Sequence, residues 1–180
     1  MKIRRIVTGR DGAGKSCFVA DGAPPKAHDF VHIPGMHVSR LWATDPLPVL
    51  PGKFGDPTVT QTSIVPRQGG TQLLILTLPP DSVMQGAGFD PVAAGAENMA
   101  QVPGLAELFE QDCPGMHTTD TVDYGIVLEG EVSLELDDGR VVQLRKHDVV
   151  VQNGTRHAWR NPGRSPATMA FVLIGAKRQA

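Results

Sequence analysis

Residues 115–176 read GMHTTDTVDYGIVLEGEVSLELDDGRVVQLRKHDVVVQNGTRHAWRNPGRSPATMAFVLIGA and decide the fold of this chain. Apolar and polar residues alternate through 132–136, VSLEL, as in a strand with one buried face. The tripeptide DDG at 137–139 supplies a hairpin turn, because Asp and Gly tolerate the positive φ that tight hairpins need. Further turn signals recur about every ten residues. This pattern predicts an all-β antiparallel barrel or sandwich, and a closed barrel would bring His117 and His157 to one interior.

The early part of this stretch carries polar residues at a defined spacing. His117, Thr119, Asp123 and Gly130 follow one another as H-x-T-x3-D-x6-G. This spacing resembles the first motif of the cupin family, G-x5-H-x-H-x3,4-E-x6-G. Thr119 stands where the family has its second histidine and Asp123 where it has its glutamate, while Gln111 replaces the leading glycine.

The later part carries a second spacing of the same kind. Gly154, His157 and Asn161 fall at the matching positions of the second cupin motif, G-x5-P-x-G-x2-H-x3-N. Lys146 and Gln152 stand at its glycine and proline positions. The chain is therefore identified as resembling a small single-domain cupin of the RmlC-like jelly-roll superfamily, closely over its C-terminal third.

The resemblance implies a cupin-type antiparallel double-stranded β-helix, or jelly-roll barrel. Residues 1–66 are expected to form an N-terminal strand and loop arm that packs on the barrel or on a partner subunit. Residues 67–180 are expected to form the barrel. An insertion at about 81–114 would carry one or two short helices and serve as a lid or a packing flap.

The resemblance also implies a site for a divalent metal ion, Fe, Mn, Ni or Zn. His117, Asp123 and His157 would be the ligands, and they would leave coordination positions open. Thr119 would hydrogen-bond a metal-bound water or a substrate oxygen, and Trp159 would give an aromatic wall to the pocket. Without the resemblance, the residues favour two hydrogen-bonded core histidines, with Asp123 as an exposed loop acid.

Three functional classes follow from these residues. The first is a metal-dependent cupin enzyme acting on a small organic acid or aromatic compound, by dioxygenation, decarboxylation, dehydration or isomerisation. The second is a cupin that binds a small molecule without turnover, which the threonine at position 119 favours. The third is a nucleotide-binding protein, because residues 9–16, GRDGAGKS, fit the phosphate-loop pattern G-x4-G-K-[ST].

The context of residues 9–16 argues against a nucleotide site. A phosphate loop needs a helix directly after it. Here Asp21-Gly22 and Pro24-Pro25 follow after a few residues, and Phe18-Val19 prefer a strand. We therefore interpret this segment as a glycine-rich hairpin turn between strands at 3–8 and 16–20, with no nucleotide bound.

Composition bounds the remaining possibilities. The chain has 180 residues and a net charge of −2, which favour one domain and offer no basic footprint for nucleic acid or membrane. Two cysteines far apart, with no signal-peptide or membrane-length apolar run, predict a cytoplasmic protein with free thiols. Small cupins resemble proteins that pair through N-terminal segments, so a homodimer is expected.

Local patterns predict the elements that precede the barrel motifs. Strands are expected at 38–44 and at 71–78, where TQLLILTL ends at Pro79-Pro80. A short helix is expected from Asp90-Pro91 through Ala100. A better one is expected at 103–111, PGLAELFEQ, which opens with Pro and has apolar residues on one face. The histidines at 28, 32, 37 and 147 are expected to be exposed or hydrogen-bonded rather than ligands.

Overall fold

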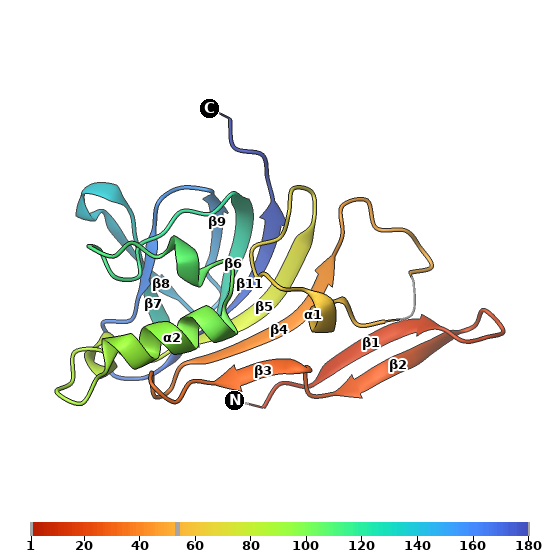
Figure 1. The fold of residues 1–180 in the computed structure, drawn as a ribbon, viewed down its shortest axis with the longest axis horizontal. Helices are drawn as coiled ribbons and strands as arrows, with labels where there is room; N and C mark the ends of the chain where they lie inside the picture. The colour runs from red at the N-terminus through yellow and green to blue at the C-terminus, as the bar shows by residue number, and fades with distance from the viewer. Residues whose placement is uncertain (1, 53–54, 180) are drawn as a thin grey trace.

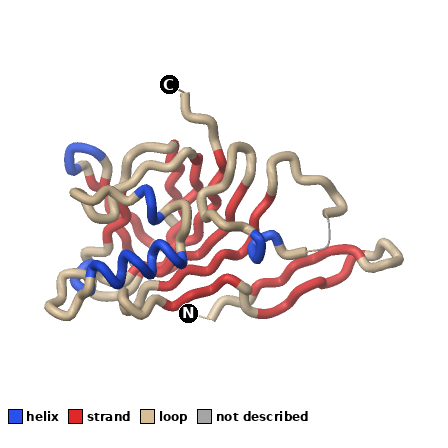
Figure 2. The backbone as a smooth tube through the Cα atoms, in the orientation of Figure 1, coloured by secondary structure: helices blue, strands red, loops and turns tan. Residues whose placement is uncertain are grey.

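The structure is a computed structural model that describes residues 2–52 and 55–179. Its strands are β1 (Arg5–Arg10), β2 (Ser16–Gly22), β3 (Lys26–Asp29), β4 (His37–Thr44), β5 (Thr71–Leu78), β6 (Thr121–Glu129), β7 (Glu131–Glu135), β8 (Val141–Arg145), β9 (Val149–Asn153), β10 (Ala158–Arg160) and β11 (Ala167–Gly175). Its helices are α1 (Pro57–Thr60) and α2 (Pro91–Gln101), with 3-10 turns η1 (Asp81–Val83), η2 (Ala106–Leu108) and η3 (Asp137–Gly139). Figures 1 and 2 show strands throughout the body and few helices. The predicted all-β architecture is confirmed.

Two antiparallel sheets form the barrel. The larger has six strands in the order β3-β4-β5-β11-β6-β9, and the smaller has three in the order β10-β7-β8. Val127 and Met169 from the larger sheet and Val132 and Leu134 from the smaller one belong to a single apolar core. This burial of apolar side chains between the sheets is the main stabilising contribution. The segment 137–139 forms the expected β7–β8 turn.

The N-terminal segment contributes directly to the larger sheet. The predicted strand at 38–44 is β4, which pairs with β5, itself found at the predicted residues 71–78. The short edge strand β3, which the sequence pattern did not reveal, pairs with β4. β4 is buried on both faces through its first half, which explains why period-2 alternation is weak there.

In the insertion, the short helix predicted from Asp90-Pro91 through Ala100 is confirmed and the second predicted helix is not. The long helix is α2, Pro91–Gln101, whereas the segment expected to be the better helix, 103–111, forms only the 3-10 turn Ala106–Leu108. Asp90 caps α2 by accepting hydrogen bonds from two amides of its first turn, and a proline follows at the first position. Gly104 has a φ of +82°, a left-handed conformation that prevents a helix from beginning at Pro103.

The first two strands form a separate two-stranded sheet that extends beyond the barrel (Figure 1). The turn between them is held by Asp11, whose Oδ1 accepts hydrogen bonds from the amides of Ala13 and Lys15, both at 2.9 Å. Strand β2 follows at once, so no helix opens after the glycines. The interpretation of residues 9–16 as a hairpin turn is confirmed. In the described part of the chain, no helix is long and apolar enough to cross a membrane.

Gly130 joins β6 to β7 at a position that only glycine fits. Its φ is +78°, and a Cβ there would lie 2.9 Å from the Ala167 Cα and the Pro166 carbonyl oxygen. We expect Gly130→Ala to lower the free energy of unfolding by about 2–3 kcal/mol, from backbone strain and overpacking together. Urea unfolding measures it.

Gly139 is the matched control for this substitution. Its φ is also positive, at +67°, but a Cβ there would meet nothing within 4 Å. Gly139→Ala should therefore show the strain alone, about 1 kcal/mol. Equal losses in the two variants would contradict the close approach of β11 to the Gly130 turn.

Candidate functional site

The structure brings His117 and His157 side by side. Their backbones form an isolated antiparallel bridge, in which the amide of each donates to the carbonyl of the other at 2.9 Å. Their imidazole centroids lie 4.3 Å apart, with a 49° angle between the ring planes. Both side chains are buried, at 7% and 2% relative exposure. The predicted convergence of these two histidines is thus a feature of the backbone pairing itself.

The hydrogen bonds of the two rings define their tautomers. The Nδ1 of His117 lies 3.0 Å from the Gly115 carbonyl oxygen, and the Nδ1 of His157 lies 2.9 Å from the Thr155 carbonyl oxygen. A carbonyl only accepts, so each Nδ1 carries the proton. In the neutral rings each Nε2 therefore has a free lone pair. In metal-binding histidines, too, one ring nitrogen donates a hydrogen bond to a carbonyl or carboxylate, and this fixes the tautomer in which the other nitrogen can bind the metal.

Burial keeps both rings neutral. It lowers the pKa of His117, against a smaller raising effect of the Gly115 carbonyl and of Glu110. Burial, together with the neighbouring His117, lowers the pKa of His157 to about 4. At neutral pH the pair therefore presents two unprotonated Nε2 atoms rather than two cations.

Asp123 lies on β6 with its side chain buried and incompletely satisfied. Its exposure is 7%, and its Oδ1 has no hydrogen-bond partner in the described chain. Burial raises the pKa of this carboxyl to about 6, despite a lowering effect of Thr121. An orphaned buried carboxylate oxygen is costly unless a cation or donor meets it.

A row of buried polar groups runs across the inner face of the larger sheet at the level of Asp123. Asp123 pairs in register with Gln152 on β9 and with Leu173 on β11, and Leu173 pairs in turn with Gln72 on β5. Both glutamines are at most 4% exposed, and the Oε1 of Gln72 is also without a partner among the described residues. The row places two orphaned oxygens inside the barrel.

Gln152 links this row to the imidazole pair. Its Nε2 donates to the Thr155 carbonyl oxygen at 3.3 Å, the same oxygen that accepts from the Nδ1 of His157. The motif comparison placed Gln152 only at a substituted proline position, and it did not reveal this positioning contact. The inward period-2 position of Gln152 in VVVQN was the available signal.

Aromatic rings flank the imidazole pair on both sides. The ring of Phe109 lies edge to face with the imidazole of His117, with the ring centroids 5.2 Å apart. The ring of Trp159 lies edge to face with the imidazole of His157, with the centroids 5.9 Å apart. Trp159 also packs on Phe171 of the core, and its role as an aromatic wall of a pocket stays a prediction. Phe109 comes from the insertion, and nothing in its local sequence marked it as a neighbour of His117.

Ion pairs fasten the insertion beside the histidines. Arg156, next to His157 in the chain, donates from Nε and Nη2 to the two carboxylate oxygens of Glu110 at 2.7 and 2.6 Å. Arg160 donates to the Pro114 carbonyl oxygen at 2.6 Å. The insertion is thus bound to the β9–β10 loop and to β10, next to the histidine pair.

Thr119 lies within the barrel, as expected, at 2% exposure. Its Oγ1 accepts a hydrogen bond from the Thr121 hydroxyl at 2.7 Å, which leaves the Thr119 hydroxyl proton available to another acceptor. Among residues 2–52 and 55–179, no three His, Cys, Asp or Glu side chains stand close enough together to hold a metal ion. Asp123 as a third ligand to the histidine pair therefore stays a prediction.

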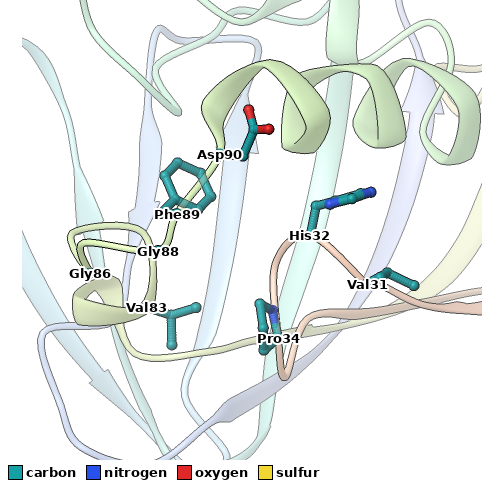
Figure 3. A pocket seen from close by; sticks show the side chains of 8 residues that line it. All are labelled: Val31, His32, Pro34, Val83, Gly86, Gly88, Phe89 and Asp90. Atoms are coloured by element: carbon teal, nitrogen blue, oxygen red, sulfur yellow. The ribbon is translucent and has the colours of Figure 1, made fainter.

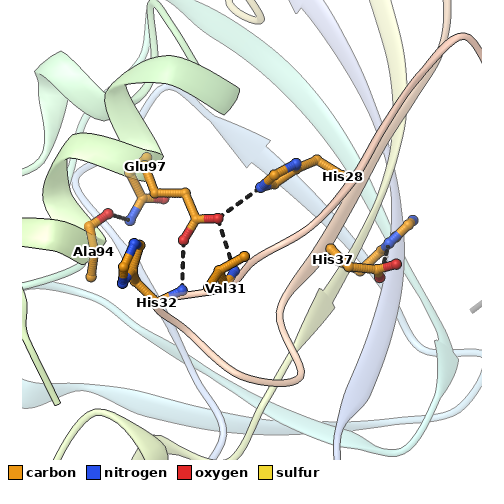
Figure 4. A network of polar contacts seen from close by, with 8 residues as sticks. His28, Val31, His32, His37, Ala94 and Glu97 are labelled. Atoms are coloured by element: carbon orange, nitrogen blue, oxygen red, sulfur yellow. Dashed lines mark hydrogen bonds and ion pairs between the residues drawn. The ribbon is translucent and has the colours of Figure 1, made fainter. Parts of the chain in front are cut away.

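The other histidines take part in different contacts. His37 lies 2.6 Å from the Asp29 Oδ1 and 2.7 Å from the Ser39 Oγ. His28 lies 2.8 Å from Glu97 on α2, whose carboxylate also accepts the amides of Val31 and His32 at 2.8 Å (Figure 4). Glu97 therefore fixes the β3–β4 loop to α2.

We expect Glu97→Gln to lower the free energy of unfolding by about 1–3 kcal/mol at pH 7, because two loop amides and His28 lose a charged acceptor. Burial would raise the pKa of Glu97, but the hydrogen bonds from Val31, His28 and His32 hold it at about 2. A lowered acid pKa contributes stability above pH 4.5, which is lost as the pH falls toward 2.

The loss in Glu97→Gln should therefore shrink between pH 4.5 and 2. Urea unfolding across this range measures it, with the exposed Glu129→Gln as control. A loss that is the same at both ends of the range would contradict the charged state assigned to Glu97.

A shallow pocket of about 280 Å³ lies at the start of α2 (Figure 3). Phe89, Val83, Pro34 and Val31 line it, together with His32 and Asp90. It contains none of the residues that the motifs single out. The imidazole pair with its row of buried polar groups is therefore the stronger candidate site.

Comparison with known proteins agrees with this geometry. Residues 110–174 match the family model described as Cupin domain. These residues include the histidine pair, Asp123 and the strands that carry them. This segment is thus similar to a cupin domain, as its two motifs indicated.

Curated relatives align with this chain over segments of 63 to 65 residues. Phomopsin biosynthesis cluster protein C' of Diaporthe leptostromiformis is 48% identical over 63 residues, 34% of this chain and 33% of that protein. Oryzines biosynthesis cluster protein J of Aspergillus oryzae is 43% identical over 65 residues, 36% of each chain. A cupin-domain-containing oxidoreductase of Hypocrea virens is 43% identical over 65 residues, 34% of each chain. The alignments thus span about a third of the length of these relatives.

Among solved structures, a putative ethanolamine utilization protein Q from Salmonella typhimurium is similar over 98% of this chain and 99% of that one. The TM-score is 0.43 and the sequence identity 9%, a likeness that says nothing about function.

Proposed function

We propose that this chain is a metal-dependent cupin enzyme that acts on a small organic acid or aromatic compound. The observation that carries the proposal is the pair of neutral imidazoles whose Nδ1 atoms are committed to backbone carbonyls, leaving both Nε2 lone pairs free. Imidazole nitrogen suits Fe, Ni and Zn, and a carboxylate oxygen suits Mn. The protein thus prepares two ligands of one site before a metal arrives.

The chemistry of the proposed donor set, two imidazole nitrogens and a carboxylate, is of the kind that binds divalent cations. His117 and His157 would hold it, and Asp123, with its orphaned Oδ1, is the proposed carboxylate ligand. Two imidazoles and one carboxylate leave positions for water and substrate. Bound there, the metal would supply Lewis acidity or an oxygen-binding centre.

The surrounding residues suit a small ring or acid. Phe109 and Trp159 offer aromatic edges on the two sides of the pair, where they would hold a planar substrate. The hydroxyl of Thr119 would donate to a substrate oxygen or a bound water. The insertion, fixed by the Arg156–Glu110 pair, would exclude bulk water during the reaction.

The names of several relatives support a redox reaction. Three matched proteins, from Hypocrea virens, Neurospora crassa and Aspergillus ruber, are described as cupin-domain-containing oxidoreductases. We therefore place oxidation ahead of decarboxylation, dehydration and isomerisation for this chain. The alternative is a cupin that binds a small molecule without turnover, which the threonine at position 119 and the incomplete ligand group favour.

Reconstitution separates these two functions. Protein loaded in turn with Fe(II), Mn(II), Ni(II) and Zn(II) would be incubated with small acids and aromatics, with and without air, and products followed by mass spectrometry. Turnover that His157→Ala abolishes supports the enzyme. Tight retention of a copurified small molecule, with no turnover under any metal, would establish the binding protein instead.

We also propose a homodimer that buries the β1–β2 hairpin. An isolated two-stranded sheet is marginally stable in water, and here Phe18 is 76% exposed and Ile6 50%. A second copy packed on this face would cover both side chains. Light scattering coupled to size exclusion should give a dimer mass that Phe18→Ser reduces, and a monomer mass for the wild type would refute the proposal.

A further inference from the structure

A second cavity, of about 520 Å³, lies between the edge strand β3 with its neighbour β4 and the helices α1 and α2. Neither His117 nor His157, nor any residue described above as contacting their rings, lines this cavity. Lys26, His28 and Arg40 line it, together with Gln61 from the end of α1. No acidic residue is among its lining residues in the described chain. The cavity is therefore basic, although the chain as a whole carries a net charge of −2.

Arg40 is a buried cation without a counter-charge. Its exposure is 5%, and its Nη2 donates to the carbonyl oxygens of Gln61 and Ser63, both at 3.2 Å. Its Nε has no partner, and no carboxylate pairs with it in the described part of the chain. Two neutral carbonyls do not compensate the desolvation of a buried guanidinium.

Lys26 stands directly opposite Arg40 in the β3–β4 ladder. Side chains at directly opposed positions share one face of the sheet, and like charges there destabilise the pairing. His28, two residues further along β3, lies on the same face. This face of the β3–β4 pair therefore carries two cations and an imidazole.

The nearby carboxylates are already engaged. Glu97 accepts from His28, Val31 and His32 (Figure 4), and Asp56 at the start of α1 pairs with Arg5 and accepts from Thr58. Gln61 adds a buried Oε1 that also lacks a partner among the described residues. Two residues that line the cavity, Arg40 and Gln61, thus each carry a buried polar atom without a partner among the described residues.

We propose that this cavity binds a small oxyanion-bearing metabolite, a carboxylate or a phosphate, with Arg40 as its principal contact and Lys26 at its rim. The anion supplies the counter-charge that Arg40 lacks and separates it electrostatically from Lys26. A hydroxyl or amide donor on the same molecule meets the Gln61 Oε1. Arg is suited to this role because its guanidinium matches the planar geometry of carboxylate and phosphate oxygens.

Isothermal titration of the full chain with sodium phosphate and, separately, with sodium succinate at low ionic strength tests the site. At least one anion should bind, and which of them binds distinguishes phosphate from carboxylate. Arg40→Gln should weaken this binding at least about tenfold, as expected for a charged hydrogen bond. Lys26→Gln, an exposed rim position, should weaken it about threefold.

Arg10→Gln, at the exposed end of β1, is the matched control and should bind as the wild type does. If Arg40→Gln fails to fold, Lys26→Gln decides, because Lys26 is exposed on an edge strand. Absence of binding of both anions to the wild type, or equal binding by the wild type and these two variants, would overturn the proposal. His157→Ala should leave anion binding unchanged. The proposal for this cavity can therefore be refuted without refuting the proposed metal site, and the reverse also holds.

Discussion

Untagged protein is expected to carry about one equivalent of a divalent transition metal, whereas His117→Ala and His157→Ala carry almost none. Each substitution removes one of the two free Nε2 lone pairs, and a single imidazole with a carboxylate rarely retains a metal through purification. Elemental analysis after chelation and reconstitution measures the stoichiometry. Circular dichroism and the urea midpoint show whether each variant keeps its barrel.

The control for this experiment is His32→Ala. His32 is exposed in the β3–β4 loop, and its engaged group is the backbone amide rather than the imidazole. This variant should keep the full metal content. Folded histidine-pair variants that retain the metal would show that the ion is held elsewhere, and the proposed enzyme would lose its basis.

Asp123→Asn is expected to shift the pH dependence of stability in metal-free protein. The pKa of Asp123 is raised to about 6 by burial, so the folded state binds a proton that the unfolded state releases near 3.8. Wild-type stability from this group is present below pH 3.8 and is lost as the pH rises through 6. Asparagine has no such loss, so the variant should gain about 3 kcal/mol on the wild type between pH 4 and 8.

His157 acts in the opposite direction over nearly the same range. Its pKa is lowered from 6.5 to about 4, so its contribution to stability is complete above 6.5 and is lost as the pH falls through 4. The two groups partly cancel in the wild type, whose stability should change little there. In Asp123→Asn the contributions of His157 and of His117, whose pKa burial also lowers, remain, so stability rises with pH.

Urea unfolding from pH 4 to 8 in the presence of a chelator measures this difference. The exposed Asp112→Asn serves as the control and should follow the wild type at every pH. A constant offset between Asp123→Asn and the wild type would mean that Asp123 titrates normally and is not a buried, unpaired carboxyl.

Much of the barrel was predictable because its determinants are local. Alternation in 132–136 and the DDG turn define β7 and its hairpin, and TQLLILTL gives β5 with its observed ends. The histidine pair was predictable from motif spacing, since the His117–His157 bridge joins the two motifs. Pattern and spacing carry this information without any knowledge of tertiary contacts.

The remaining features depend on contacts between distant segments. PGLAELFEQ has a helical pattern, yet the left-handed Gly104 and the burial of Ala106 confine it to one 3-10 turn. Gln152 acts through the Thr155 carbonyl, and Phe109 contacts His117 from a segment that Arg156 ties to the β9–β10 loop through Glu110. β3 is too short to show periodicity. These contacts depend on how distant strands pair in the sheets, and local sequence patterns do not reveal that pairing.

The most direct test of the proposed metal centre is the state of the two imidazoles before and after metal is added. Long-range nitrogen–proton NMR of the chelated protein at pH 7 should show His117 and His157 as neutral Nδ1–H tautomers. Addition of Zn(II) should then shift both Nε2 resonances and leave the Nδ1 protons in place. Nε2–H tautomers, or Nε2 resonances that Zn(II) leaves unchanged, would contradict the proposal.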